Sequence, residues 1–396
     1  MDRTHNVAVL TVAQALAASG MTVMPVLGGI VGAQLAPRPE LATLPVSLAV
    51  VGLAATTMPA ALLMRRIGRR AGFTISALFA ALAALLACWA IVGERFAVFC
   101  VAASLLGANA AFTLQYRFAA AESVPPEHVS RAVSTVMIGT LAAAWLGPEI
   151  ALLASHVVSG HEFAGSFIAV AGMYVLASAV LTLYRPLPEI RRTAAEPPPR
   201  PLAAMLSEPA FIVAVLAGVV AYGVMSFIMT ATPISMHVID GHSVDETTWV
   251  IQSHLLAMYL PSLVSGRIVA RIGTRTTMTI GTLLMVLCVV IDLRGQHLMH
   301  YWWGLVLLGI GWNLLFVAGT TQLTTAYHPS ERHRAQAVNE FAIFGLQALA
   351  SLLAGVAIQA VGWSTLNLAT LPFLALMLVA IAWAKGPPRW QRAAAD

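Results

Sequence analysis

The chain has 396 residues, of which 59% are hydrophobic and only 10% are charged. Soluble globular proteins carry about 25% charged residues, so this composition excludes an ordinary soluble domain and indicates a membrane protein. The formal net charge is +5. Because the positive residues stand in the segments between apolar runs, we assign this charge to membrane topology and not to nucleic-acid binding.

Twelve apolar runs follow one another along the chain, each long enough to cross about 30 Å of hydrocarbon as a helix. In chain order the runs are 7–30, 41–64, 72–92, 96–119, 131–155, 163–184, 209–236, 247–270, 276–293, 300–323, 334–358 and 364–384. The first run is too long for a removable signal peptide and lacks a small-residue cleavage site. The sequence therefore predicts an all-α membrane protein with twelve transmembrane helices.

The Lys and Arg residues of the connecting segments predict the orientation, because positively charged loops stay on the cytoplasmic side. If the N-terminus is cytoplasmic, the opposite side holds only Arg38, Arg95 and Arg294 of the 22 Lys and Arg residues. We therefore predict that both termini are cytoplasmic. The chain has 3 cysteines, which all lie within apolar runs and form no Cys-x-x-Cys pair, so neither a disulfide framework nor a thiol metal site is expected.

An internal repeat divides the chain into two parts. Three pairs of similar segments occur in the same order: RRIGRR (65–70) with ARIGTR (270–275), LLGANAAF (105–112) with LLGIGWNLLF (307–316), and PPEHVSRAV (125–133) with PSERHRAQAV (329–338). The separation is nearly the same for all three pairs, which predicts two six-helix halves in parallel arrangement. The halves are residues 1–184 and 209–396, and the charged, proline-rich segment 185–208 is expected to be a cytoplasmic linker.

This architecture resembles the major facilitator superfamily over essentially the whole chain. The loop signature of that family, G-x-x-x-D-R-x-G-R-R, is matched by Arg66, Gly68, Arg69 and Arg70 in the first half and by Gly266, Arg271, Gly273 and Arg275 in the second. Ala61, Arg65 and Ala270 depart from it, the last two at the acidic position. The resemblance implies gating loops at both places, with the usual acidic gate altered. It further implies a monomeric transporter of the bacterial inner membrane, surrounded by lipid, and not an enzyme.

Polar side chains within the apolar runs bear on the cargo, because such groups are costly in lipid and tend to line a pathway. They are Gln14, Asn109, Gln115, Glu149, Gln252, His254, Asn313, Gln322, Asn339, Glu340 and Gln347. We take Glu149, Asn313, Asn339 and Glu340 as candidates for coupling or for lining the cavity. Glu340 could accept a proton, or it could pair with Arg334. No Lys or Arg lies at mid-depth, so a buried cation that holds an organic anion is not expected.

Two pairs of metal-binding side chains stand one helical turn apart in consecutive runs. Met225 and Met229 share one face of the seventh run, and His254 and Met258 share one face of the eighth. Counting outward from the loop between these runs puts Met229 level with His254 and Met225 level with Met258. Four soft or borderline ligands are thereby predicted in two adjacent layers.

The chemistry of this ligand set favours monovalent copper. Thioether sulfur is polarizable and uncharged, so it selects Cu(I) and brings no charge into hydrocarbon. We therefore expect copper as the transported substrate, with no permanently bound cofactor. Met236, His237 and His242 are candidates for a copper entrance path, although a polar turn explains them equally well. Methionine is also a common gap-filler in apolar packing, and the chain has 16 Met.

The Met and His pattern, with TATPISMHV (230–238) and MYLPSLVSGRI (258–268), resembles the CcoA-like copper importers, a branch of the superfamily. The resemblance implies that Met225, Met229 and His254, together with Met258, bind the metal and that import proceeds by alternating access. Some copper-importing members carry cysteines near this region, whereas here the nearest is Cys288. The riboflavin transporters, a closely related branch, share much of the surrounding sequence.

The main alternative cargo is riboflavin or a similar neutral aromatic metabolite. Trp249, Trp312, Tyr116 and Tyr222 are the candidates for stacking on its ring. The two hypotheses differ in geometry. A copper site should bring a Met sulfur and the His nitrogen to one point, whereas a riboflavin site should be wide and walled by aromatic side chains.

A drug-efflux antiporter is a weaker alternative. Gly139, Gly147 and Pro148 match part of the Gly-Pro motif of such proteins, but its further glycines do not match. A helix kink explains Pro148 equally well.

Overall fold

The computed structural model describes residues 3–125, 128–185, 201–327 and 331–384, and every regular element in these ranges is helical. The elements are α1 (Arg3–Leu35), η1 (Pro39–Leu41), α2 (Leu44–Ile67), α3 (Arg69–Val92), α4 (Phe96–Thr113), α5 (Tyr116–Glu122), α6 (Val129–Leu153), α7 (Ala164–Leu181), α8 (Leu202–Leu206), α9 (Pro209–Pro233), η3 (Ile234–Ile239), α10 (Val244–Tyr259), α11 (Ser262–Asp292), α12 (Leu298–Thr325), α13 (Arg332–Leu368) and α14 (Leu371–Trp383). The all-α prediction is confirmed.

Ten helical stretches of the described residues are long and apolar enough to cross a membrane, two fewer than predicted. Gly273 (φ 82°, ψ 161°) and Gly362 (φ 73°, ψ 175°) are non-helical residues inside α11 and α13. At Gly273 the stretch Ser262–Asp292 divides into the end of the eighth predicted run and the whole ninth. At Gly362 the stretch Arg334–Trp383 divides into the eleventh and twelfth runs. The eighth run is itself divided between α10, which has only 16 residues, and the start of α11. Within the described residues the predicted runs are thus largely helical, and the eighth is broken at Leu260 and Pro261.

The repeated loop has the same backbone conformation in both copies. Gly68, between α2 and α3, has φ 83° and ψ 155°, close to the values at Gly273. Nothing lies within 4 Å of a Cβ atom added at either position, so space does not require glycine there. The positive φ does, because it costs a residue with a side chain conformational energy that glycine avoids. Each glycine turns the chain from one helix into the next.

The chain packs as two compact units. Unit 1 comprises Met1–Glu189, Met229–Gln252 and Ser351–Ala360, and unit 2 comprises Ile190–Ile228, Ser253–Ala350 and Val361–Asp396. Helices α9, α10 and α13 thus contribute residues to both units. The predicted halves 1–184 and 209–396 stay a prediction, and residues 186–200 of the predicted linker 185–208 lie outside the described residues.

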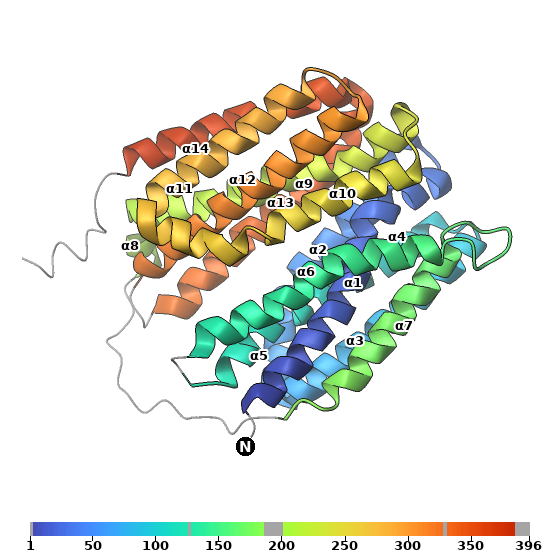
Figure 1. The fold of residues 1–396 in the computed structure, drawn as a ribbon, viewed down its shortest axis with the longest axis horizontal. Helices are drawn as coiled ribbons and strands as arrows, with labels where there is room; N and C mark the ends of the chain where they lie inside the picture. Colours follow the sequence, from blue (N-terminus) through green and yellow to red (C-terminus); the bar gives the residue numbers. More distant parts are fainter. Residues whose placement is uncertain (1–2, 126–127, 186–200, 328–330, 385–396) are drawn as a thin grey trace, which may run out of the picture. The chain divides into compact units, whose positions relative to one another are not determined.

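Unit 1 is built from closely packed helix pairs. Helix α1 runs beside α6 and α3 runs beside α7 (Figure 1), and α2 packs against α4. A Cβ atom added at Gly107 of α4 would lie 1.8 Å from the carbonyl oxygen of Ala49, and one added at Gly52 of α2 would lie 2.1 Å from that of Ser104. Small residues of this kind allow helix backbones to approach closely in membranes, where van der Waals packing drives helix association.

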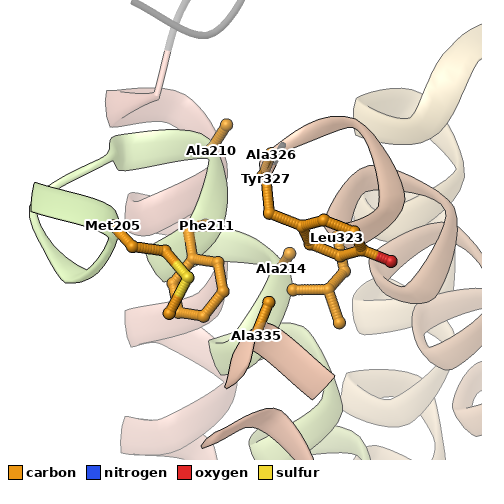
Figure 2. Packing of buried hydrophobic residues seen from close by; sticks show 8 residues of the cluster. All are labelled: Met205, Ala210, Phe211, Ala214, Leu323, Ala326, Tyr327 and Ala335. Atoms are coloured by element: carbon orange, nitrogen blue, oxygen red, sulfur yellow. The ribbon is translucent and has the colours of Figure 1, made fainter. Parts of the chain in front are cut away.

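Unit 2 contains the pair α11 and α12, with α14 packed on α11. A buried apolar cluster joins α8 and the start of α9 to the end of α12 and the start of α13, as Figure 2 shows. Its members are Met205, Ala210, Phe211, Ala214, Leu323, Ala326, Tyr327 and Ala335. This cluster fixes one end of α9 against α12 and α13, and thereby sets which residues meet further along the three helices.

Candidate functional site

The predicted copper ligands are all buried. The exposed fractions of Met225, Met229, His254 and Met258 are 5%, 8%, 0% and 4%. Met225, His254 and Met258 belong to unit 2, whereas Met229 belongs to unit 1. Burial suits both metal ligands and packing residues, and the four-ligand set stays a prediction.

His254 has a defined tautomer. Its Nδ1 atom lies 2.7 Å from the carbonyl oxygen of Leu305 on α12. Because a carbonyl oxygen only accepts hydrogen bonds, Nδ1 donates, which leaves the lone pair on Nε2. Nε2 is buried and has no hydrogen-bonding partner. The ring can therefore accept a hydrogen bond or coordinate a soft cation through Nε2.

Asn313 ties α12 to the break between α10 and α11. Its Nδ2 atom donates hydrogen bonds to the carbonyl oxygen of Met258 at 2.7 Å and to Oγ of Ser262 at 2.6 Å. This residue, predicted to line the cavity, thus ties α12 to both α10 and α11. Asn339 lies against α9, because a Cβ atom added at Gly218 would be 3.9 Å from its Oδ1. Glu340, the next residue of α13, is half-buried.

The residues predicted as a copper entrance form a capped turn between η3 and α10. Met236 is buried, and Nδ1 of His237 lies 2.8 Å from the carbonyl oxygen of His242. The backbone N–H of Ser243 donates to Oε2 of Glu246 at 2.9 Å, and the Glu246 N–H donates to Oγ of Ser243 at 3.1 Å. This reciprocal pair is a capping box. The Ser243 hydrogen bonds, and then His242, lower the pKa of Glu246 below 4.5.

Within the described residues no three His, Cys, Asp or Glu side chains gather as a metal site.

Glu149 meets Gln252 within unit 1. Nε2 of Gln252 on α10 donates a hydrogen bond to the carbonyl oxygen of Trp145 at 2.9 Å and lies 3.5 Å from Oε1 of Glu149, both on α6. The sequence singled out Glu149 and Gln252 separately, and their proximity was not predicted.

A chain of hydroxyl groups in unit 1 was likewise not predicted from the sequence. Oγ of Ser351 on α13 donates to Oγ of Ser47 on α2 at 3.0 Å and lies 3.0 Å from Oγ1 of Thr230 on α9. All three residues are buried. We call Ser47, Ser351 and Thr230 the hydroxyl chain. Nearby, a Cβ atom added at Gly355 would lie 1.9 Å from Oγ1 of Thr43. Helix α13 therefore closely approaches the turn between η1 and α2.

The predicted gating loops make contacts with neighbouring helices. Nη2 of Arg69 forms an ion pair with Oε1 of Glu122 on α5 at 2.6 Å, and Nη2 of Arg275 donates to the carbonyl oxygen of Ile381 on α14 at 2.7 Å. Glu122 thus supplies an acidic partner that the altered signature lacks. Arg66, Arg70, Gly266 and Arg271 are exposed. A role of these loops in gating stays a prediction.

An aromatic cluster occupies unit 2 around α9. The ring centroid of Tyr222 lies 5.1 Å from Trp312, 5.3 Å from Phe316 and 5.9 Å from Phe344. Trp312 stacks on Phe316 at 5.2 Å with an interplanar angle of 16°, and it lies 6.2 Å from Tyr259. We call Tyr222, Tyr259, Trp312, Phe316 and Phe344 the aromatic cluster. It draws on α9, α10, α12 and α13, and all its members except Trp312 are half-buried.

Two of the four aromatic residues proposed from the sequence, Tyr222 and Trp312, therefore come together. The other two do not join them: Tyr116 packs edge-on against Phe73 in unit 1 with centroids 4.7 Å apart, and Trp249, also in unit 1, is 40% exposed. Phe316, a member of the cluster, was not singled out because hydropathy alone does not distinguish a cluster member from a lipid-facing residue.

Glycines on α9 bring α13 close to the aromatic cluster. A Cβ atom added at Gly218 would lie 2.4 Å from Cδ1 of Ile343, and one added at Gly223 would lie 3.3 Å from Cδ2 of Leu346. These contacts flank Tyr222 along the helix. The chain thus packs the backbone of α9 tightly on α13 while the Tyr222 ring meets the rings of α12 and α13.

Comparison with known proteins gives a consistent result. The Major Facilitator Superfamily profile matches residues 9–241 and 216–396. The riboflavin transporter RfnT of Brucella anthropi is 41% identical over 377 residues, which cover 95% of this chain and 94% of that protein. The uncharacterized transporter YdeG of Bacillus subtilis is 29% identical over 395 residues, with coverages of 96% and 91%.

Solved structures agree on the fold. A crystal structure of a bacterial homologue of the human lysosomal transporter Spinster, inward-facing and unoccupied, superposes with a TM-score of 0.73 at 14% identity and covers 96% of both chains. At this identity the likeness concerns the fold alone. With the profile match along nearly the whole chain and ten helices of the described residues long and apolar enough to cross a membrane, this protein belongs to the Major Facilitator Superfamily and is a multi-pass membrane transporter.

Proposed function

We propose that this protein is a secondary transporter that imports riboflavin across the bacterial inner membrane, with both termini in the cytoplasm. The aromatic cluster of unit 2 is the observation that carries the proposal. The 41% identity to a riboflavin transporter supports the same cargo. Riboflavin thereby replaces copper as the main hypothesis, and it is a transported substrate and not a resident cofactor.

The chemistry of riboflavin suits contact with the aromatic cluster. Its three-ring system is flat and uncharged, and aromatic side chains can contact either face. Stacked and edge-on contacts of this kind each contribute about 0.5–1.5 kcal/mol beyond area burial. An uncharged cargo needs no buried cation. The half-buried rings of Tyr222, Phe316 and Phe344 retain accessible surface for such a contact. In the proposed mechanism the protein alternates between two states that expose the aromatic cluster to opposite sides of the membrane.

The test is uptake of radiolabelled riboflavin by a bacterial strain that lacks its own riboflavin transporter. Wild type and the Trp312→Leu variant are compared at equal abundance in the membrane. Trp303→Leu is the matched control, because Trp303 lies on the same helix but is 49% exposed and outside the aromatic cluster. We expect uptake by wild type and the control, and strongly reduced uptake by Trp312→Leu. Wild-type uptake no greater than that of the empty vector would refute the proposal.

Copper import that uses His254 of unit 2 as a ligand is the second candidate function. The specific observation in its favour is the buried, unpartnered Nε2 of His254, whose lone pair is set by the bond from Nδ1 to Leu305. Uptake of radioactive copper in the same strain separates the two cargoes. This candidate predicts uptake by wild type that is lost in His254→Leu; it fails if wild type takes up no copper.

A further inference from the structure

We propose that Gln347 on α13 and Trp312 on α12 bind the polar edge of the cargo ring, so that the transporter selects flat, uncharged heterocycles that carry a cyclic imide or amide. This inference rests on the proposed function and specifies which part of the cargo is recognised.

Two unsatisfied polar atoms motivate the proposal. Oε1 of Gln347 and Nε1 of Trp312 are buried and have no hydrogen-bonding partner. The first atom only accepts hydrogen bonds and the second only donates one. Leaving such groups unpaired away from water is unfavourable, and each one needs an explanation. A ligand that brings a donor and an acceptor would satisfy both.

Helix register places both residues beside the aromatic cluster. Leu346 of α13 packs against Gly223 of α9, and Gln347 is the next residue along α13. Gln347 also lies three positions after Phe344, so the two side chains share a face of α13, and the Phe344 ring is 5.9 Å from Tyr222. Gln347 therefore stands about one helical turn from the level at which the rings meet.

Trp312 reaches the same level from α12. Gly319 of α12 packs against Ala217 of α9, and Trp312 lies two turns earlier on α12. Its ring centroid is 5.1 Å from that of Tyr222. Trp312 thus offers an aromatic face to the cluster and an unused N–H at its edge.

The isoalloxazine ring of riboflavin has the complementary pattern. Its pyrimidine end carries an imide N–H between two carbonyl groups. The N–H can donate to Oε1 of Gln347, and a carbonyl oxygen can accept from Nε1 of Trp312, while the ring faces contact the aromatic cluster. A donor and an acceptor on a rigid edge give selectivity, because an analogue that lacks one of them leaves a buried protein group unpaired.

Gln322, a second glutamine of unit 2, has a structural role. Oε1 of Gln322 accepts a hydrogen bond from Oγ1 of Thr274 at 3.1 Å, and its Nε2 donates to the carbonyl oxygen of Ala210 at 3.2 Å. Both ends of Gln322 are satisfied within the protein. Gln322→Leu is therefore the matched control for Gln347→Leu.

The experiment measures competition against radiolabelled riboflavin uptake. The competitors are lumiflavin, which has the ring but no sugar chain, and riboflavin methylated on the imide nitrogen, which cannot donate. In wild type we expect lumiflavin to compete, and the methylated analogue to compete about tenfold more weakly than riboflavin. Gln347→Leu should raise KM for riboflavin about tenfold and should treat riboflavin and its methylated analogue alike, within about twofold.

The controls separate recognition from folding. Gln322→Leu should change the amount of folded protein without changing the preference against the methylated analogue. Trp312→Phe keeps an aromatic face but loses the N–H, so it should raise KM and retain that preference.

A Gln347→Leu variant that still discriminates against the methylated analogue overturns this inference and leaves riboflavin transport intact. A wild type that takes up no riboflavin overturns the proposed function, and this inference with it.

Discussion

The hydroxyl chain and glycine contacts of unit 1 and the aromatic cluster of unit 2 bring helices together with different chemistry. In unit 1, Gly107 places a backbone directly on Ala49, and the hydroxyl chain through Ser351 satisfies its members within the protein. Around α9 in unit 2, half-buried rings meet, and the polar atoms Oε1 of Gln347 and Nε1 of Trp312 have no partner. Satisfied polar groups between tightly packed backbones stabilise one arrangement, whereas unsatisfied ones beside aromatic surface are suited to a ligand.

Membrane-buried polar residues differ in whether the protein itself satisfies them. Gln14, for example, donates to Oγ1 of Thr140 at 3.0 Å and so belongs with the structural contacts of unit 1. Polarity alone did not distinguish Gln14 from Gln347 in the sequence. For these two residues the presence or absence of a protein partner does. Substitutions in the hydroxyl chain and at the contact of α2 with α4 should therefore affect folding and conformation, and those in the aromatic cluster should affect cargo.

The largest effect is expected for Gly107→Leu. Its Cβ atom would lie 1.8 Å from the carbonyl oxygen of Ala49, so α2 and α4 must separate. Overpacking that forces the backbone to move costs about 1–3 kcal/mol and occasionally more. We expect little monodisperse protein after detergent extraction, measured by size-exclusion chromatography. Gly172→Leu is the control, because nothing lies within 4 Å of a Cβ atom at Gly172. Equal yields of the two variants would contradict the tight packing of unit 1.

The next effect in size is expected for Tyr222→Leu. The substitution removes ring contacts to Trp312, Phe316 and Phe344, and the proposed contact to the cargo. We expect KM for riboflavin to rise about tenfold, since aromatic pairs contribute about 0.5–1.5 kcal/mol each. Uptake kinetics at matched abundance provide the measurement. If KM is unchanged and only the abundance falls, Tyr222 is a packing residue and the aromatic cluster is structural.

Ser351→Ala should have an intermediate effect confined to unit 1. Ser351 is the middle member of the hydroxyl chain, and its loss leaves the hydroxyls of Ser47 and Thr230 without this link. Buried hydrogen bonds of this kind contribute about 1 kcal/mol each. We expect faster backbone hydrogen exchange in η3 and in Ser351–Ala360, measured by mass spectrometry.

Ser178→Ala is the control for the hydroxyl chain. Oγ of Ser178 donates to the carbonyl oxygen of Thr74 at 3.1 Å, which joins α7 to α3. Its removal should speed exchange in those two helices and leave η3 unchanged. A uniform change in both variants would show that the hydroxyl chain has no local role.

A smaller effect on stability is expected for Arg69→Gln. The side chains of Arg69 and Glu122 are 27% and 57% exposed, so solvent screens their 2.6 Å ion pair. Exposed pairs contribute about 0–1 kcal/mol. If the loop is a gate, the uptake rate should fall more than thermal stability does. Glu122→Gln should reproduce that fall, and the double variant should add nothing further, as a double-mutant cycle would reveal. Additive losses would mean that the two residues act independently.

The sequence predicted local features better than it predicted the candidate site. Runs of about 20 apolar residues are set by the thickness of the membrane, so the helices could be predicted, whereas the break between α10 and α11 inside the eighth run could not. The glycine of the repeated loop could be predicted as well, and Gly68 and Gly273 share one backbone conformation. Ser47 and Ser351 are 304 residues apart, and neither carries a signal that distinguishes it from other helical serines. Helical spacing places Met225 and Met229 on one face, but it does not specify cargo.

The smallest expected effect concerns the pH dependence at the capped turn of unit 1. The hydrogen bonds from Ser243, and then His242, lower the pKa of Glu246 below 4.5 in the folded protein. A carboxyl group with a lowered folded-state pKa stabilises the fold above its unfolded-state pKa, and this contribution is lost as the pH falls through the folded-state pKa. We therefore expect the melting temperature of wild type to fall slightly more than that of Glu246→Gln when the pH is lowered below about 4.5. Asp245→Asn, an exposed neighbour, should leave the wild-type profile unchanged. If the Glu246→Gln profile coincides with wild type, the capping box contributes nothing measurable, and the end of α10 is held by its packing alone.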